Sequence, residues 1–326
     1  MTYRGGRART WRLWVSATLL AGACCGCSPK PAGTGIERGS APGEPDSIQE
    51  VIARVNRNAA GMDFVFRGGV TAAGEYRHGD KLESFELHGP LLYRRPKNLY
   101  LKLEHVGGTL EAGSNEDEFW LWEKFQSPRY SWGRHDRMVG DFDADLPLRP
   151  DLLAEVLGLG DLPADTKGPL GPAMWVGSHS YELIFLDRDE SGRTRLSKAI
   201  DVDRHEPFLV KSLVYFRHDG RPVVQVGLDD YGPIAGSAVL MPRRIRIDWL
   251  PDRGWVELRF TTMQRFDKPE AEARFRSPLE RGLDVGEIRR VDRPTLPGAD
   301  EAVRPAPQTG AGASSRPTDR PGAAEH

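Results

Sequence analysis

Apolar and polar positions alternate along much of the chain between residues 62 and 262. Leu99, Leu101 and Leu103 lie on one side of such a segment, while Lys102 and Glu104 lie on the other. Because successive side chains of a β-strand point to opposite faces, the pattern predicts strands with one buried and one solvated face. Strands are predicted at residues 64–76, 81–93, 98–104, 108–114, 119–124, 180–186, 195–202, 209–217, 223–231, 244–249 and 255–262.

Short turns separate most of these segments, among them His78-Gly79-Asp80 and His218-Asp219-Gly220. Turns of this length join neighbouring strands as hairpins. Because hairpins pair their strands antiparallel, we expect an antiparallel meander.

A helix is predicted before the first strand. Ser47 and Glu50 have the spacing of a capping box, and Gly61 marks the end of the pattern. The apolar residues of this segment recur at helical spacing, which predicts one buried stripe. They are Ile48, Val51, Ile52 and Val55.

One insertion, residues 141–172, lacks the strand pattern. Within it, residues 150–157 begin with Pro150, precede Gly158 and predict a short apolar helix. Its apolar positions are Leu152, Leu153, Val156 and Leu157. With so few helices, a large sheet curls, and we expect the N-terminal and inserted helices to cover its concave face. The fold class is therefore mainly β (α+β), a single curved antiparallel sheet with either a solid core or a cavity beneath the helices.

The N-terminus has a different pattern. A leader rich in arginine precedes residues 13–23, an apolar run too short to cross a bilayer as a finished helix. All three cysteines follow, at Cys24, Cys25 and Cys27. Small residues that run directly into cysteine resemble a bacterial lipoprotein signal, in which the cysteine is acylated and becomes the new N-terminus.

Lipid attachment is expected at Cys24 or Cys27. Cys24 follows the small residues 21–23, which favours it as the acylated residue. Acylation of Cys27 would instead remove the other cysteines with the signal and leave no spare thiol in an oxidising compartment. A metal-binding cysteine cluster is the alternative, but such a site needs further ligands and no other cysteine exists. No metal and no cofactor is therefore expected.

Composition divides the chain further. Residues 28–45 and 292–326 are rich in Pro, Ala and Gly with little to bury, so we expect a disordered tether and a disordered tail. With residues 1–27 as the signal region, the folded domain is predicted at residues 46–291. The 47 acidic and 45 basic residues nearly cancel, which gives nucleic-acid binding no electrostatic support.

Several segments are similar, in order, to the periplasmic lipoprotein-carrier superfamily that includes LolA and LolB. Residues 91–101 (LLYRRPKNLYL) resemble a strand that ends in an Arg-Pro pair before an aromatic and apolar strand. Residues 119–122 (FWLW) resemble a later tryptophan-containing strand, although the turn before it lacks glycine. Residues 201–209 resemble a polar hairpin, and residues 275–285 resemble the closing segment.

The resemblance implies a half-open β-barrel whose apolar concave face accepts acyl chains under helical lids. Arg95 matches the residue that hydrogen-bonds the lid and holds it shut. From the residues alone, Arg94 and Arg95 point to opposite faces of a strand, or both are solvated at its end. The expected lining of the apolar interior is Leu99, Leu101, Leu103, Trp120, Trp122, Leu152, Leu153 and Val156. The two tryptophans have the alternative of being simple core residues.

Catalytic patterns are weak. Asp187 to Lys198 begins like a calcium loop, but Lys198 occupies the position of the bidentate glutamate, so a hairpin turn is expected. Ser178, His179, His205 and Asp219 are pieces of a hydrolase triad without a nucleophile elbow. We expect no enzymatic activity and no catalytic residue.

These observations predict a lipid-anchored protein of the bacterial cell envelope that binds lipid or the acyl chains of another lipoprotein. Neither Cys24 nor Cys27 is followed by Asp, which favours the outer membrane, facing the periplasm. One alternative is a structural or assembly lipoprotein that binds protein partners with a filled core. Another is a cell-envelope hydrolase.

The cysteine cluster generates a first prediction. The protein made in cells should fractionate with membranes, and replacing Cys24, Cys25 and Cys27 together by Ser should release it into the soluble fraction. Single replacements identify the acylated cysteine. A wild-type protein that is already soluble contradicts the anchor.

Overall fold

A computed structural model describes residues 47–78, 81–125, 127–135, 150–163, 170–188, 192–251 and 254–292. All of them belong to one compact unit of the chain, Ile36–His326. The predicted signal region, both candidate lipid-attachment cysteines, the tether, and the tail from residue 293 lie outside the described residues.

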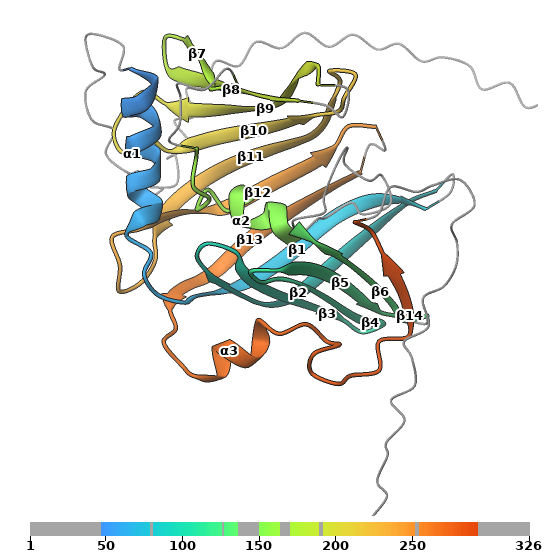
Figure 1. The fold of residues 1–326 in the computed structure, drawn as a ribbon. Helices are drawn as coiled ribbons and strands as arrows, with labels where there is room; N and C mark the ends of the chain where they lie inside the picture. The colour runs from blue at the N-terminus through green and yellow to red at the C-terminus, as the bar shows by residue number, and fades with distance from the viewer. Residues whose placement is uncertain are drawn as a thin grey trace, which may run out of the picture. The chain divides into compact units, whose positions relative to one another are not determined.

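The described strands form one sheet of fourteen strands, in the order β14-β6-β5-β4-β3-β2-β1-β13-β12-β11-β10-β9-β8-β7 (Figure 1). Neighbours pair antiparallel except β14, which pairs parallel with β6. The strands are β1 (Phe66–His78), β2 (Lys81–Arg94), β3 (Asn98–His105), β4 (Gly108–Ser114), β5 (Glu118–Lys124), β6 (Arg129–Arg134), β7 (Ala173–Val176), β8 (Ser180–Arg188), β9 (Thr194–Asp203), β10 (Val210–Phe216), β11 (Pro222–Pro233), β12 (Leu240–Trp249), β13 (Gly254–Arg265) and β14 (Glu287–Arg290).

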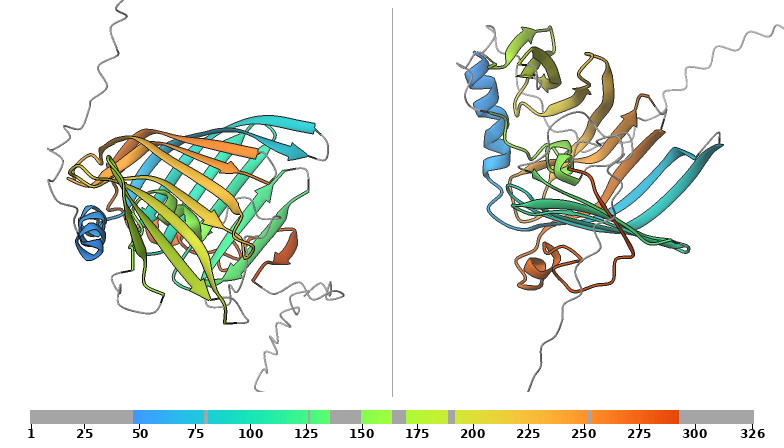
Figure 2. Two further views of the ribbon diagram at one scale, coloured as in Figure 1. Left: turned by 90° about the horizontal axis from the view of Figure 1, so that it is seen from above. Right: turned by 45° about the vertical axis from the view of Figure 1, so that its right-hand side comes forward.

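Two meanders make up this sheet. Strands β1 to β6 follow one another on one side, and strands β7 to β13 follow one another on the other. The long ladder between β1 and β13 joins the two meanders at the middle of the sheet. The sheet curves without closing (Figure 2), so the predicted mainly β half-barrel is confirmed.

The helix α1 (Ile48–Ala60) has the predicted capping box. Ser47 Oγ accepts a hydrogen bond from the Glu50 backbone N–H, and Glu50 Oε2 accepts one from the Ser47 N–H at 2.9 Å. The apolar stripe is buried at Val51, Ile52 and Val55, and Gly61 is the C-cap as expected. The inserted helix α2 (Pro150–Val156) is also confirmed, and Gly158 behind it has the positive φ of a helix stop.

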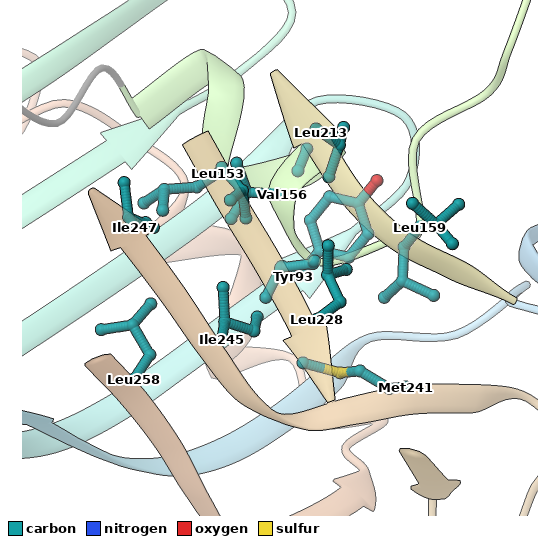
Figure 3. Close-up of a cluster of buried hydrophobic side chains, with 14 of the residues drawn as sticks. Tyr93, Leu153, Val156, Leu159, Leu213, Leu228, Met241, Ile245, Ile247 and Leu258 are labelled. Atoms are coloured by element: carbon teal, nitrogen blue, oxygen red, sulfur yellow. The ribbon is translucent and has the colours of Figure 1, made fainter. Parts of the chain in front are cut away.

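The main core lies on the concave face of the sheet. It joins the buried side chains of α1 and α2 to those of both meanders. Helix α2 packs against β3, β4 and β5, and Figure 1 shows it between the two meanders. Figure 3 shows part of this core, in which Leu153 and Val156 of α2 meet Tyr93, Leu213, Leu228 and Ile245 from the sheet.

Part of the opposite face, beside strands of the first meander, is also covered. Helix α3 (Glu270–Arg274) supplies Ala271 to a small cluster with Leu92 and Tyr100. A second small cluster contains Trp120, Trp122 and Tyr130 with Val285, from the segment that leads to β14. Strands of the first meander are therefore buried on two faces.

The predicted strands are confirmed with shifts of a few residues at their ends. Four described elements were not predicted: β6, β7, α3 and β14. In β6, Gly133 and the preceding Pro128 obscure the alternation of Tyr130 and Trp132. Three of the four residues of β14 are charged, so its pairing with the edge of β6 comes from tertiary structure rather than from an apolar pattern.

Two strand glycines give a matched test of the sheet. A Cβ at Gly89 would lie 1.8 Å from the Lys102 backbone oxygen, whereas a Cβ at Gly227 meets nothing within 4 Å. Gly89→Ala should lower the free energy of unfolding by about 1–3 kcal/mol, because the neighbouring backbone must move. Gly227→Ala should be neutral or slightly stabilising. Urea denaturation followed by circular dichroism measures both, and equal stabilities would contradict this packing.

Candidate functional site

The candidate site is the set of contacts that fasten α1 and α2 over the concave face. Its central residue, Arg95, directly follows the last residue of β2. The Arg95 side chain donates a hydrogen bond from Nη1 to the Ala59 backbone oxygen at 2.6 Å, in the last turn of α1. Its Nη2 forms an ion pair with Asp161, in the segment after α2. Arg95 therefore joins the sheet to both helical segments.

Two asparagines of α1 strengthen this junction. The Asn56 amide donates to the Leu162 backbone oxygen and accepts from the Leu162 N–H, both at 2.9 Å. The Asn58 amide makes the same pair of bonds with Leu240 at the start of β12, at 2.8 and 2.9 Å. Each side-chain amide pairs with both the N–H and the C=O of one backbone residue, so the two contacts hold α1 in one position.

A further polar contact fixes α2 itself. Glu155 forms an ion pair with Lys198 of β9, and its other oxygen accepts a hydrogen bond from the Tyr215 hydroxyl of β10 at 2.7 Å. Arg95 and Asp161 tie the α2 region to the first meander, while Glu155 ties it to the second. We call these contacts the two latches of α2.

Most of the expected lining residues lie together in the concave core. Leu99, Leu101 and Leu103 of β3 are buried in the main cluster with Leu153 and Val156 of α2, and Leu152 packs against it. Tyr93 belongs to the same cluster and lies near Leu153 and Val156 (Figure 3). Burial raises the pKa of its hydroxyl, which donates to the Pro96 backbone oxygen at 3.1 Å. In the structure, the apolar side chains of α2 cover this part of the sheet.

The expectation that Trp120 and Trp122 line the concave interior is wrong, while the alternative that both are simple core residues is confirmed. Both side chains lie in the small cluster on the opposite face, with Tyr130 and Val285. The residues of β5 that join the concave core are Phe119 and Leu121. The strand is apolar on both faces, so its alternation alone could not show which pair points inward.

Arg94 points away from the candidate site. Its side chain forms an ion pair with Glu272 of α3 and lies over the Phe275 ring, with 5.3 Å from its guanidinium carbon to the ring centroid. Adjacent arginines therefore fasten helices on opposite faces of the sheet. This arrangement agrees with the expectation that Arg95 is the inward residue of the pair.

Residues of the weak catalytic patterns make contacts within hairpins, turns and loops. Residues Asp187 and Arg195 face each other in the β8–β9 hairpin, and Asp219 accepts a backbone hydrogen bond from Arg221 at 3.0 Å in the β10–β11 turn. Burial tends to raise the pKa of Asp203, but hydrogen bonds from the His205 side chain and backbone outweigh it, so this pKa lies below its usual value. Such bonds stabilise the loop between β9 and β10.

Within the described part of the chain, no group of three or more His, Cys, Asp or Glu residues is placed to hold a metal ion. Among the same residues, no helix has the length and apolar character needed to cross a membrane.

No protein-family model and no curated protein sequence matches the chain. Among solved structures, it is similar to a LolA superfamily protein from Nitrosomonas europaea, with 15% identity, a TM-score of 0.42, and coverage of 72% of this chain and 100% of that one. It is also similar to a Vibrio parahaemolyticus domain named for outer membrane lipoprotein sorting, at 8% identity and a TM-score of 0.45, covering 70% and 98%. A DUF1329 family protein from Desulfovibrio piger has 12% identity and a TM-score of 0.44, covering 71% and 96%. At these identities and TM-scores the similarity carries no argument about the family or the function of this chain.

Sequence reasoning missed four residues of the two latches, namely Glu155, Asp161, Lys198 and Tyr215, and the two asparagines that hold α1, Asn56 and Asn58. One signal was available, because Lys198 lies two residues before Ile200, on the apolar face of β9. The partners of the other residues are far away in sequence, so no local pattern could have found them.

Arg95 and Arg94 provide a reciprocal test. Arg95→Leu removes a charge-assisted contact of about 1.5–3 kcal/mol, which should speed amide hydrogen exchange in α1 and in residues 159–162. Arg94→Leu should instead speed exchange in α3 and leave α1 unchanged. Hydrogen exchange with mass spectrometry measures both segments in one experiment. Equal protection of α1 in wild type and Arg95→Leu would show that the contact does not hold the helix.

Proposed function

We propose that this protein is a membrane-anchored, non-catalytic lipoprotein whose concave face binds lipid or the acyl chains of another lipoprotein. The observation that carries the proposal is the attachment of α2. A seven-residue helix covers the apolar concave face and is held there by one latch to each meander. In this proposal α2 is a lid, and opening both latches exposes the aliphatic face beneath it.

The chemistry of that face supports an apolar ligand. The side chains beneath α2 are aliphatic or aromatic, such as Leu99, Leu101 and Ile245. An acyl chain that replaces the lid side chains gains about 25 cal/mol for each Å² of apolar surface removed from water. The burial between α2 and the sheet is lost when α2 leaves, so the free energies of burying the lid and of burying the ligand nearly cancel. The latches then decide whether the lid or the ligand occupies the concave face.

The protein's location in this proposal is the bacterial cell envelope, on the outer membrane facing the periplasm. Its anchor is the acylated cysteine, Cys24 or Cys27. The structural neighbours named for LolA and for lipoprotein sorting share the fold, while the ligand is proposed from the apolar face and its lid.

A scaffold for protein partners is the second candidate. It is favoured by the full burial of the side chains between α2 and the sheet, since Leu101 of β3, Leu153 of α2 and Leu157 are at most 1% exposed. In that case α2 is a permanent part of the core. The two candidates differ in whether the helix leaves the sheet when an acyl chain is offered.

Binding of an environment-sensitive fluorescent fatty acid to a protein of residues 28–326 distinguishes the carrier from the scaffold. The carrier proposal predicts saturable binding, and tighter probe binding by Arg95→Leu, because that variant weakens by about 1.5–3 kcal/mol a latch that holds the competing lid closed. Arg94→Leu is the matched control and should bind the probe with wild-type affinity. Native mass spectrometry with solvent extraction then identifies co-purified lipid.

The scaffold candidate predicts a different result. No acyl probe should bind, or wild type and both arginine variants should bind and release it equally. Either result would count against a lid over the concave face.

A further inference from the structure

One charged side chain of β9 lies on the apolar concave face. Lys198 shares that face with Ile200 and Val202, which are fully buried in the main core. The Lys198 side chain is only 19% exposed, and its ammonium group lies 4.9 Å from the centroid of the Phe185 ring. A cation in such surroundings needs a partner, because its transfer out of water is strongly unfavourable.

The partner is supplied by the lid. Glu155 of α2 forms an ion pair with Lys198 and accepts the hydrogen bond from Tyr215 at 2.7 Å. A strand cation and a strand hydroxyl, from β9 and β10, thus hold one carboxylate between them. Tyr215 is 5% exposed, so this carboxylate-binding pair lies inside the core and not on the outer surface.

Lid opening removes the carboxylate that neutralises Lys198. If α2 leaves the sheet, Glu155 leaves with it, and Lys198 and Tyr215 remain on the concave face without the carboxylate. An uncompensated cation there is costly, whereas a ligand that brings its own anion restores the pair. The lid carboxylate therefore occupies the place that a ligand anion would take.

We infer that Lys198 and Tyr215 bind the anionic headgroup of an acidic lipid, a carboxylate or a phosphate, whose acyl chain replaces α2. The inference rests on the proposed function and adds a ligand class to it. Glu155 competes with the headgroup for the same two donors. The protein therefore selects acidic lipids over neutral lipids of equal chain length.

Displacement of a neutral fluorescent acyl probe tests this selection on residues 28–326. The competitors are palmitate, palmitoyl lysophosphatidate and neutral monopalmitin, which present a carboxylate, a phosphate and no charge on the same chain. Wild type should bind at least one anion about tenfold more tightly than monopalmitin, the size expected for a charge-assisted contact. The anion that shows this preference identifies the headgroup.

The double variant at Glu155 and Lys198 removes both charges of the ion pair, so neither is left unpaired. Glu155→Gln with Lys198→Met should abolish the preference and keep monopalmitin binding, while Glu155→Gln alone should increase the preference because the competing charge is gone. Asp229→Asn with Arg244→Met removes an exposed ion pair of β11 and β12 and is the matched control. It should behave as wild type.

Two results overturn the inference. If the anion preference is the same in wild type and in the double variant at Glu155 and Lys198, the headgroup does not contact Lys198, although acyl binding itself stands. If no competitor and no probe binds any of the proteins, the proposed function fails and the inference fails with it.

Discussion

The ladder between β1 and β13 joins the first strand of the first meander to the last strand of the second, and the concave face depends on it. Its register runs from Phe66 opposite Arg265 to Glu75 opposite Trp255, with one bulge beside Gly69. Without this ladder the two meanders would be separate sheets, each with an apolar face open to water. Because they are one curved sheet, their apolar faces look toward each other, and the helices α1 and α2 cover them together.

The alternation of strand side chains then decides which helix each residue can reach. Arg94 and Arg95 are neighbours in sequence, yet one fastens α3 and the other fastens α1 and the segment after α2. The same rule separates Trp120 from Phe119 in β5. A shift of one residue in either strand would exchange these contacts, so the register and the positions of the helices are specified together.

Much of the fold follows from local sequence. The capping box of α1, the stop at Gly158 and the strands with clean alternation were all predictable, because each depends on residues close together in the chain. The short strands β7 and β14 were not, since they exist only as partners of β8 and β6. Within the candidate site, Arg95 could be chosen beforehand, whereas its partners Ala59 and Asp161 lie 36 and 66 residues away and required the fold.

The polar latches explain why a helix as short as α2 has one position on an apolar face. Apolar contacts are not directional, so they bind α2 to the face without fixing its orientation. Ion pairs and hydrogen bonds are directional, and those of Glu155 and Asp161 fix the helix against β9, β10 and Arg95. A buried ion pair adds little net stability compared with apolar residues of the same size, but breaking one side of it is costly. A ligand that brings its own anion avoids that cost, because the anion replaces Glu155 as the partner of Lys198. The opening of the lid therefore depends on the headgroup of the proposed ligand.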